Sequence, residues 1–152
     1  MTGPKPRLAG ALWAGALALC LVFSGTGAAQ ESAAQWRARH GKHFQRSWGI
    51  DIVGVRPVAS GVMLRFDYRV LDPAKAAPLA ERRSKPYLID EATRTALAVP
   101  AMEKVGELRQ VTTLDPNRTY FMIFGNPGGL VKSGSRVTLR VGSFHVEGLV
   151  VD

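Results

Sequence analysis

The sequence predicts an all-β fold, an antiparallel immunoglobulin-like β-sandwich of about six to eight strands that follows an N-terminal signal peptide. Short apolar segments, several of them alternating with polar residues, recur from residue 50 to residue 151. Turn residues separate these segments, and no pattern in 49–152 supports a helix of more than one or two turns. A domain of about 100 residues with this pattern is typical of an immunoglobulin-like sandwich, with a small closed barrel as the alternative.

Residues 1–29 are expected to be a secretory signal peptide. Lys5 and Arg7 give a positively charged start, an apolar run follows from 8 to 23, and small residues precede the favoured cleavage site after Ala29. The apolar run of about 16 residues is short for a spanning helix, which needs roughly 20. A retained membrane anchor is therefore the less favoured alternative, and we expect no transmembrane span in the mature chain.

The only cysteine, Cys20, lies inside this segment. Residues 17–20 resemble the lipobox of bacterial lipoproteins, whose cysteine is lipidated, but Leu19 stands where that motif has a small residue. If Cys20 leaves with the signal peptide, the mature chain has no thiol for a disulfide, a thiolate metal site or a nucleophile. We then expect the hydrophobic core alone to hold the domain together.

The chain is basic, with 20 Lys and Arg residues against 12 Asp and Glu residues. Removing Lys5 and Arg7 leaves 18 against 12, a net charge of +6 for the mature chain. Most of the cations are arginines, whose planar guanidinium groups pair well with phosphate and carboxylate, so an anionic envelope component is an expected partner. No block of five or six cations occurs, which argues against nucleic acid as a partner.

Residues 30–48 form a basic leader in which cations and aromatic residues are mixed around a single acid, Glu31. Gly41 would weaken a helix there. The favoured interpretation is a leader that packs its aromatic residues on its own domain, which spans 49–152. The alternative is attachment to anionic lipid or polysaccharide, since cations neutralise charge and aromatic rings add apolar area. The residues that would bind such a surface are Arg37, Arg39, Lys42, Arg46, Trp36 and Trp48.

The first strands are expected between residues 50 and 70. A β pattern starts at Ile50 and ends near Pro57, a residue that suits a strand end or an edge. The next strand has the cleanest alternation in the chain, and on its polar face Asp67 can pair with Arg65, with Arg69 or with a cation on the neighbouring strand. Its buried face is expected to carry Val62, Leu64, Phe66, Tyr68 and Val70.

The middle of the chain predicts one short helix and one hairpin. Asp72 is a helix N-cap and Pro73 a first helical residue, but Pro78 should stop the helix after about one turn. Residues 86–89 and 96–99 then flank a charged turn, as in a β-hairpin.

A long connection is expected from 101 to 114, with a strand from Arg109 to Leu114 as one option. Asp115-Pro116-Asn117-Arg118 has the residues of a type I turn. It leads into 120–124, which is apolar at every position and is therefore predicted to be a central strand covered on both faces.

The best-specified element is a C-terminal β-hairpin around Gly142-Ser143. Glycine at the first central position suits a two-residue type II′ turn, because that position requires a positive φ. The turn fixes the register, so Arg140 is expected opposite His145 and Thr138 opposite Glu147 on the polar face of the hairpin.

No motif points to catalysis, and we expect a protein that is not an enzyme and has no cofactor. The glycine-rich segment 125–133 differs from a phosphate-binding loop, because Val131 precedes Lys132 where that motif has glycine. Adjacent carboxylates such as Asp90-Glu91 stand in a turn and are expected to be solvated.

The three histidines are the only imidazoles available to a metal. His40 and His43 are three residues apart in the leader, and His145 projects from the polar face of the C-terminal hairpin. A periplasmic copper-type binding protein could combine them with methionine ligands. The methionines of the domain are Met63, Met102 and Met122.

A series of short landmarks resembles an uncharacterised family of small exported bacterial β-sandwich proteins. The landmarks are Trp48-Gly49-Ile50, Arg69-Val70-Leu71-Asp72-Pro73, Lys85-Pro86-Tyr87-Leu88-Ile89-Asp90, Tyr120-Phe121 and Asn126-Pro127-Gly128. The resemblance covers the domain and not the leader. It implies an exported β domain and supplies no activity, substrate or site residue.

These observations lead to one functional expectation and two alternatives. We expect an exported, periplasmic or secreted, non-catalytic binding or structural module of the bacterial envelope, whose partner is an envelope protein or an anionic envelope component. The first alternative is the copper-type metal-binding protein. The second is a peripheral envelope protein that binds anionic lipid or polysaccharide through its basic leader.

Overall fold

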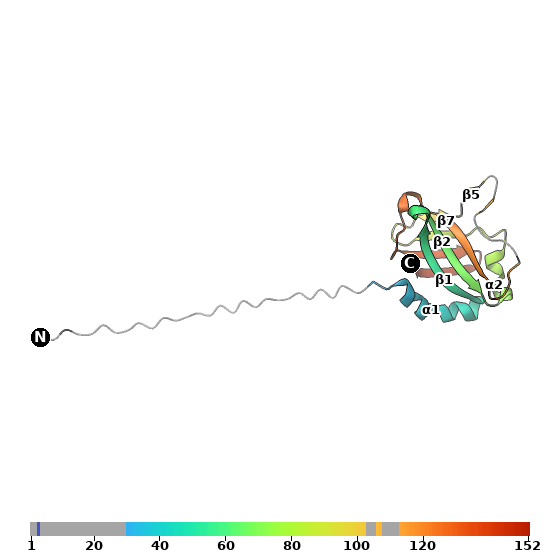
Figure 1. Ribbon diagram of the computed structural model, residues 1–152, viewed down its shortest axis with the longest axis horizontal. Helices are drawn as coiled ribbons and strands as arrows, with labels where there is room; N and C mark the ends of the chain where they lie inside the picture. Colours follow the sequence, from blue (N-terminus) through green and yellow to red (C-terminus); the bar gives the residue numbers. More distant parts are fainter. Residues whose placement is uncertain (1–2, 4–29, 103–105, 108–112) are drawn as a thin grey trace.

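The computed structural model describes residues 3, 30–102, 106–107 and 113–152, which form two principal antiparallel sheets and two helices (Figure 1). The expectation of a mainly antiparallel β fold is confirmed for this part of the chain, with two helices beside the sheets. Apart from Gly3, the signal peptide expected at 1–29 lies outside the described residues. The optional strand from Arg109 falls largely outside them as well, and the structure assigns no strand to 113–114.

The first sheet has the strand order β1-β2-β7, formed by Ile50–Val58, Met63–Val70 and Thr119–Gly125. The inward-facing alternation expected for β2 is confirmed from Leu64 to Val70, while Val62 lies before the strand and is exposed. The prediction of a central strand at 120–124 is wrong, because β7 pairs with β2 alone among the described strands. Its outer residue Phe121 is only half-buried and lies under the guanidinium of Arg65, 4.4 Å from the ring centre.

The second sheet has the order β4-β3-β8-β9. Its strands are β3 (Tyr87–Asp90), β4 (Ala96–Ala98), β8 (Arg136–Val141) and β9 (Phe144–Val150). Both predicted hairpins, β3–β4 and β8–β9, are confirmed. A short third pair, β5 (Ala101–Met102) with β6 (Gly106–Glu107), stands apart from the two principal sheets.

The inward faces of the two sheets meet in one core. Leu64, Phe66 and Tyr68 of the first sheet and Leu88, Leu139 and Phe144 of the second belong to a single cluster of buried residues. On one side of this core Val55 of β1 bridges in parallel to Val151, and the Asp152 amide donates to the Val55 carbonyl at 2.7 Å.

The leader forms helix α1 (Ala33–Trp48) and packs along β1 and β9 (Figure 1). A capping box at Ser32 and Gln35 starts the helix, and Gly49 ends it in the left-handed conformation. Trp36 and Phe44 are buried, and Phe44 and Trp48 both contact Phe144 edge-on. This matches the interpretation of a leader that packs its aromatic residues on its own domain.

Helix α2 (Pro73–Ala80) is longer than the expected single turn. The Asp72 carboxylate caps it by accepting from the amides of Ala74 and Lys75, as predicted. The prediction that Pro78 stops the helix is wrong, since the helix continues for two more residues. Leu79 is fully buried beyond the proline, so packing on the core offsets the lost backbone hydrogen bond.

Two connections depart from the sequence analysis: the turn at 115–118 differs from its predicted type, and the contacts of Asn126 were not predicted. Asn117 has φ 63°, whereas the third residue of a type I turn has φ near −90°, so the type I prediction at 115–118 is wrong. Asn126 is fully buried, and its side chain bonds the carbonyls of Gly61 and Val131 and the amide of Val131. It therefore ties the turn between β1 and β2 to the loop that follows β7.

Gly41→Ala should raise the free energy of unfolding by about 0.5–1 kcal/mol, because alanine restricts the unfolded chain and favours the helix. A Cβ atom at Gly41 would meet no atom within 4 Å. Gly49→Ala is the opposite control, since residue 49 has φ 60° and its Cβ would lie 2.6 Å from that of Asp72. Urea unfolding measures both, and destabilisation by Gly41→Ala would contradict the helix described here.

Candidate functional site

Helix α1 carries a row of cations on the side that faces away from the core. Arg39, Lys42, His43 and Arg46 are exposed, and their spacing places them along one side of the helix. The helix contains no acidic residue. We call Arg39, Lys42 and Arg46 the basic face of α1.

The six residues expected to bind an anionic surface divide into three groups, of which Arg37 alone is the third. Arg39, Lys42 and Arg46 lie on the basic face. Trp36 is 2% exposed and packs within the core, and half-buried Trp48 contacts Phe144, so neither ring forms an open aromatic surface beside the cations. The aromatic side of the helix is therefore packed on the core, and the cationic side is exposed to solvent.

Arg37 belongs to the fold rather than to the basic face. One guanidinium nitrogen lies 2.8 Å from both carboxylate oxygens of Asp152, which fastens α1 to the segment after β9. Gly54 lies directly beneath this ion pair, and a Cβ atom there would collide with the Asp152 carboxylate. The close approach of the ion pair thus requires glycine in β1.

The remaining cations around α1 differ in whether their side chains are paired. Arg39 pairs with Glu31 at 3.2 Å, and Glu31 also pairs with Arg136 of β8 at 3.3 Å. Lys42 and Arg46 have no side-chain partner in the part of the chain that the structure describes. The ammonium of Lys75 donates to the Arg46 carbonyl at 3.0 Å, so α2 adds a further cation at the end of this helix.

The structure does not gather the histidines expected as metal ligands. His40 stacks at a tilt on Trp36 with 5.0 Å between ring centres, and His43 contacts Phe44 edge-on at 5.2 Å. His145 is exposed on β9 opposite Arg140, as the predicted register required. Among the described residues no three His, Cys, Asp or Glu side chains are placed to hold a metal ion.

The methionines are dispersed as well. Met122 is fully buried in the core, and Met63 is half-buried at the start of β2. Met102 lies in β5, and its side chain is outside the described part of the chain.

A hollow of about 460 Å³ lies on the outer face of the four-stranded sheet. Ile89 and Thr138 contribute to its lining from adjacent strands. Four charged residues from β8, β9 and the β3–β4 turn surround them. These residues are Glu91, Arg94, Arg140 and Glu147.

A β-bulge in β9 shapes this hollow. The hairpin register is as predicted at Arg140 and His145, but it shifts between Val137 and Leu139, so the expected simple pairing of Thr138 with Glu147 is wrong. Gly148 takes φ 64°, the left-handed conformation that a glycine bulge requires. The Glu91 carboxylate accepts from the Gly148 amide at 2.7 Å and from the Thr138 hydroxyl at 2.9 Å.

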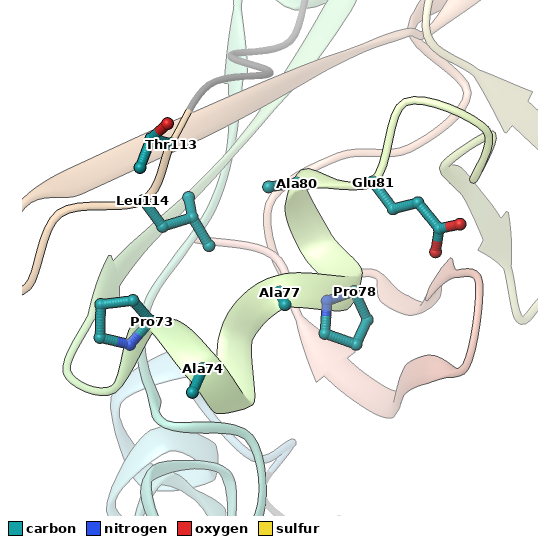
Figure 2. Close-up of a pocket in the computed structure, with 8 residues that line it drawn as sticks. All are labelled: Pro73, Ala74, Ala77, Pro78, Ala80, Glu81, Thr113 and Leu114. Carbon is teal, nitrogen blue, oxygen red and sulfur yellow. The ribbon is translucent and has the colours of Figure 1, made fainter.

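An apolar groove of about 700 Å³ runs along α2 (Figure 2). Alanine and proline side chains of the helix form one wall, and Leu114 projects toward them from the other side. The carboxylate of Glu81 points away from Leu114 at the end of the helix. The groove offers apolar contact and presents no charged group toward its centre.

Sequence reasoning missed both the hollow and the groove. A single glycine inside an apolar strand, as at Gly148, is a known sign of a bulge and could have located the hollow.

The described residues contain no helix that is both long and apolar enough to cross a membrane. No family model, no curated protein and no solved structure matches this chain.

Glu91→Ala should lower the free energy of unfolding by about 2 kcal/mol, because the bulge amide and the Thr138 hydroxyl both lose a charged acceptor. Glu91→Gln keeps an oxygen acceptor in the same place and should cost about half as much. Chemical denaturation of the two variants tests this. Equal stability of Glu91→Ala and the parent chain would show that Glu91 does not support the bulge.

Proposed function

We propose that this chain is an exported, non-catalytic binding module of the bacterial envelope that attaches to anionic lipid through the basic face of α1. The observation that carries the proposal is that Lys42 and Arg46 remain unpaired on a helix whose opposite side is fixed in the core. The cations are therefore held in one array before any ligand arrives. The proposal assigns no reaction, no cofactor and no metal to the chain.

Export is supported by the sequence of residues 1–29. Two cations, an apolar run and small residues before Gln30 are the parts of a secretory signal peptide. The resemblance to a family of small exported β-sandwich proteins points the same way. We propose cleavage after Ala29 and a periplasmic or secreted location.

We further propose that the domain is an immunoglobulin-like β-sandwich. The strand order supports this assignment: β1-β2-β7 corresponds to strands A-B-E, and β4-β3-β8-β9 corresponds to C′-C-F-G. The two sheets also share one core, as the sheets of a sandwich do.

The expected strength of lipid binding follows from the charges. Each Lys or Arg close to an anionic membrane surface contributes about 1 kcal/mol. Exposed charges are screened within a Debye length, so this contribution falls as salt is added. Arg37 is excluded from the array because its guanidinium is occupied by Asp152.

The variant Lys42→Gln with Arg46→Gln should bind about 30-fold more weakly than the parent chain to vesicles of phosphatidylcholine and phosphatidylglycerol. Glutamine removes charge while keeping good helix propensity. Cosedimentation at several salt concentrations measures the affinity. The matched control is Arg83→Gln with Lys85→Gln, which removes two exposed cations from the connection between α2 and β3.

Four outcomes distinguish the alternatives. Loss confined to the α1 variant, with release by salt, supports the proposal. Equal loss in both variants would show that net charge alone matters, and salt-insensitive binding that persists on pure phosphatidylcholine would replace the basic face with an apolar contact. Binding to an anionic polysaccharide but not to vesicles would assign the same face to the other ligand.

Mass spectrometry of the chain purified from a bacterial host tests the export proposal. The expected mass is that of a chain that begins at Gln30. An intact residue 1, or a lipid on Cys20, would overturn the cleavage site.

A further inference from the structure

The hollow on the four-stranded sheet holds opposite charges apart. Arg94, Arg140 and Glu147 are exposed and line the same hollow. Within the described residues none of their side chains forms an ion pair or a hydrogen bond. Two guanidinium groups and one carboxylate therefore stand unneutralised around a single depression.

The other arginines that lie in strands are paired. Arg56 and Arg65 share Asp67, Arg69 pairs with Asp51, and Arg136 pairs with Glu31. Arg140 is the exception among strand arginines in the described part of the chain. Arg140 is unpaired although two acidic residues, Glu91 and Glu147, line the same hollow.

The bulge involves both of the acids that line the hollow. Glu91 is occupied by the amide of Gly148 and the hydroxyl of Thr138, so one of its oxygens serves the backbone of the bulge. The extra residue in β9 shifts Glu147 from a direct cross-strand position, and bulges commonly redirect side chains beside binding sites. The fold thus fixes the Glu91 carboxylate and the backbone from which Glu147 projects.

We propose that this hollow binds a short peptide in its zwitterionic form. The ligand carboxylate would be held by the arginines, which match a carboxylate with two parallel hydrogen bonds, and the ammonium group by Glu147. The volume of about 460 Å³ lies within the range of about 300–1,000 Å³ that is usual for small-ligand sites. Thr138 and Ile89 supply polar and apolar contact for the peptide between its charged ends.

This inference does not rest on the lipid-binding proposal. The hollow is formed by β3, β8, β9 and the β3–β4 turn, whereas the basic face lies on α1. Failure of either proposal leaves the other standing.

Titration of the ¹⁵N-labelled chain with trialanine tests the proposal directly. Trialanine should shift the amide signals of Thr138, Arg140, Glu147 and Gly148 in a saturable way. Trialanine amide lacks the carboxylate and N-acetyl-trialanine lacks the ammonium group, so each should bind at least about tenfold more weakly.

Two substitutions assign the charges. Arg140→Gln should weaken binding of trialanine and of N-acetyl-trialanine, while Glu147→Gln should weaken binding of trialanine and of trialanine amide. Arg83→Gln removes an exposed arginine outside the hollow and should change nothing. The spectra of the variants also report whether the core signals are unchanged.

Three results would overturn the proposal. One is the absence of shifts in the hollow at millimolar trialanine, and another is equal affinity for the capped and uncapped peptides. The third is a set of shifts centred on α2 or α1, which would place the peptide in another site.

Discussion

The fold depends on the packing of α1 against the seam between β1 and β9. Phe144 lies at the start of β9 and contacts two rings of the helix. Its ring centre is 6.2 Å from that of Phe44 and 5.1 Å from that of Trp48. Trp36 lies in the same core and stacks on Phe44, with 6.0 Å between ring centres. Because the described chain has no disulfide to join the sheets, this aromatic contact helps to close the core near the parallel bridge between Val55 of β1 and Val151, the residue after β9.

The same packing decides which residues are available to ligands. An amphipathic segment that contains both tryptophans and arginines could place either side outward. Here burial of the rings is favoured by the large apolar area of an aromatic side chain, about 150–250 Å². Lys42 and Arg46 then remain exposed and unpaired, where their charge is hydrated and can meet an anionic partner.

Local pattern predicted much of the fold. Strand β2 and the β8–β9 hairpin were predictable because alternation and turn chemistry act over a few residues. The edge position of β7 was not, because Tyr120-Phe121-Met122 reads as covered on both faces, whereas Arg65 partly covers the outer side. The path of α2 past Pro78 depends on tertiary burial of Leu79, which no local rule contains.

The candidate sites were less predictable than the fold. Which arginines are free depends on partners far away in sequence, as with Arg37 and Asp152, which are 115 residues apart. The hollow depends on a bulge that shifts Glu147 along the strand and whose backbone amide at Gly148 is bound by the Glu91 carboxylate. Sequence could indicate the cations of the leader, but only the folded chain separates Lys42 and Arg46 from those already paired.

The position of the tryptophans gives the domain an internal optical reporter. Outside residues 1–29 the sequence has two tryptophans, Trp36 and Trp48, and both lie on α1. Intrinsic tryptophan emission of the processed chain would therefore monitor the environment of the helix, while far-ultraviolet circular dichroism would follow the sheets as well. If the helix detached before the sheets melted, the two signals would separate, and an undocked state of the leader would become visible without any added label.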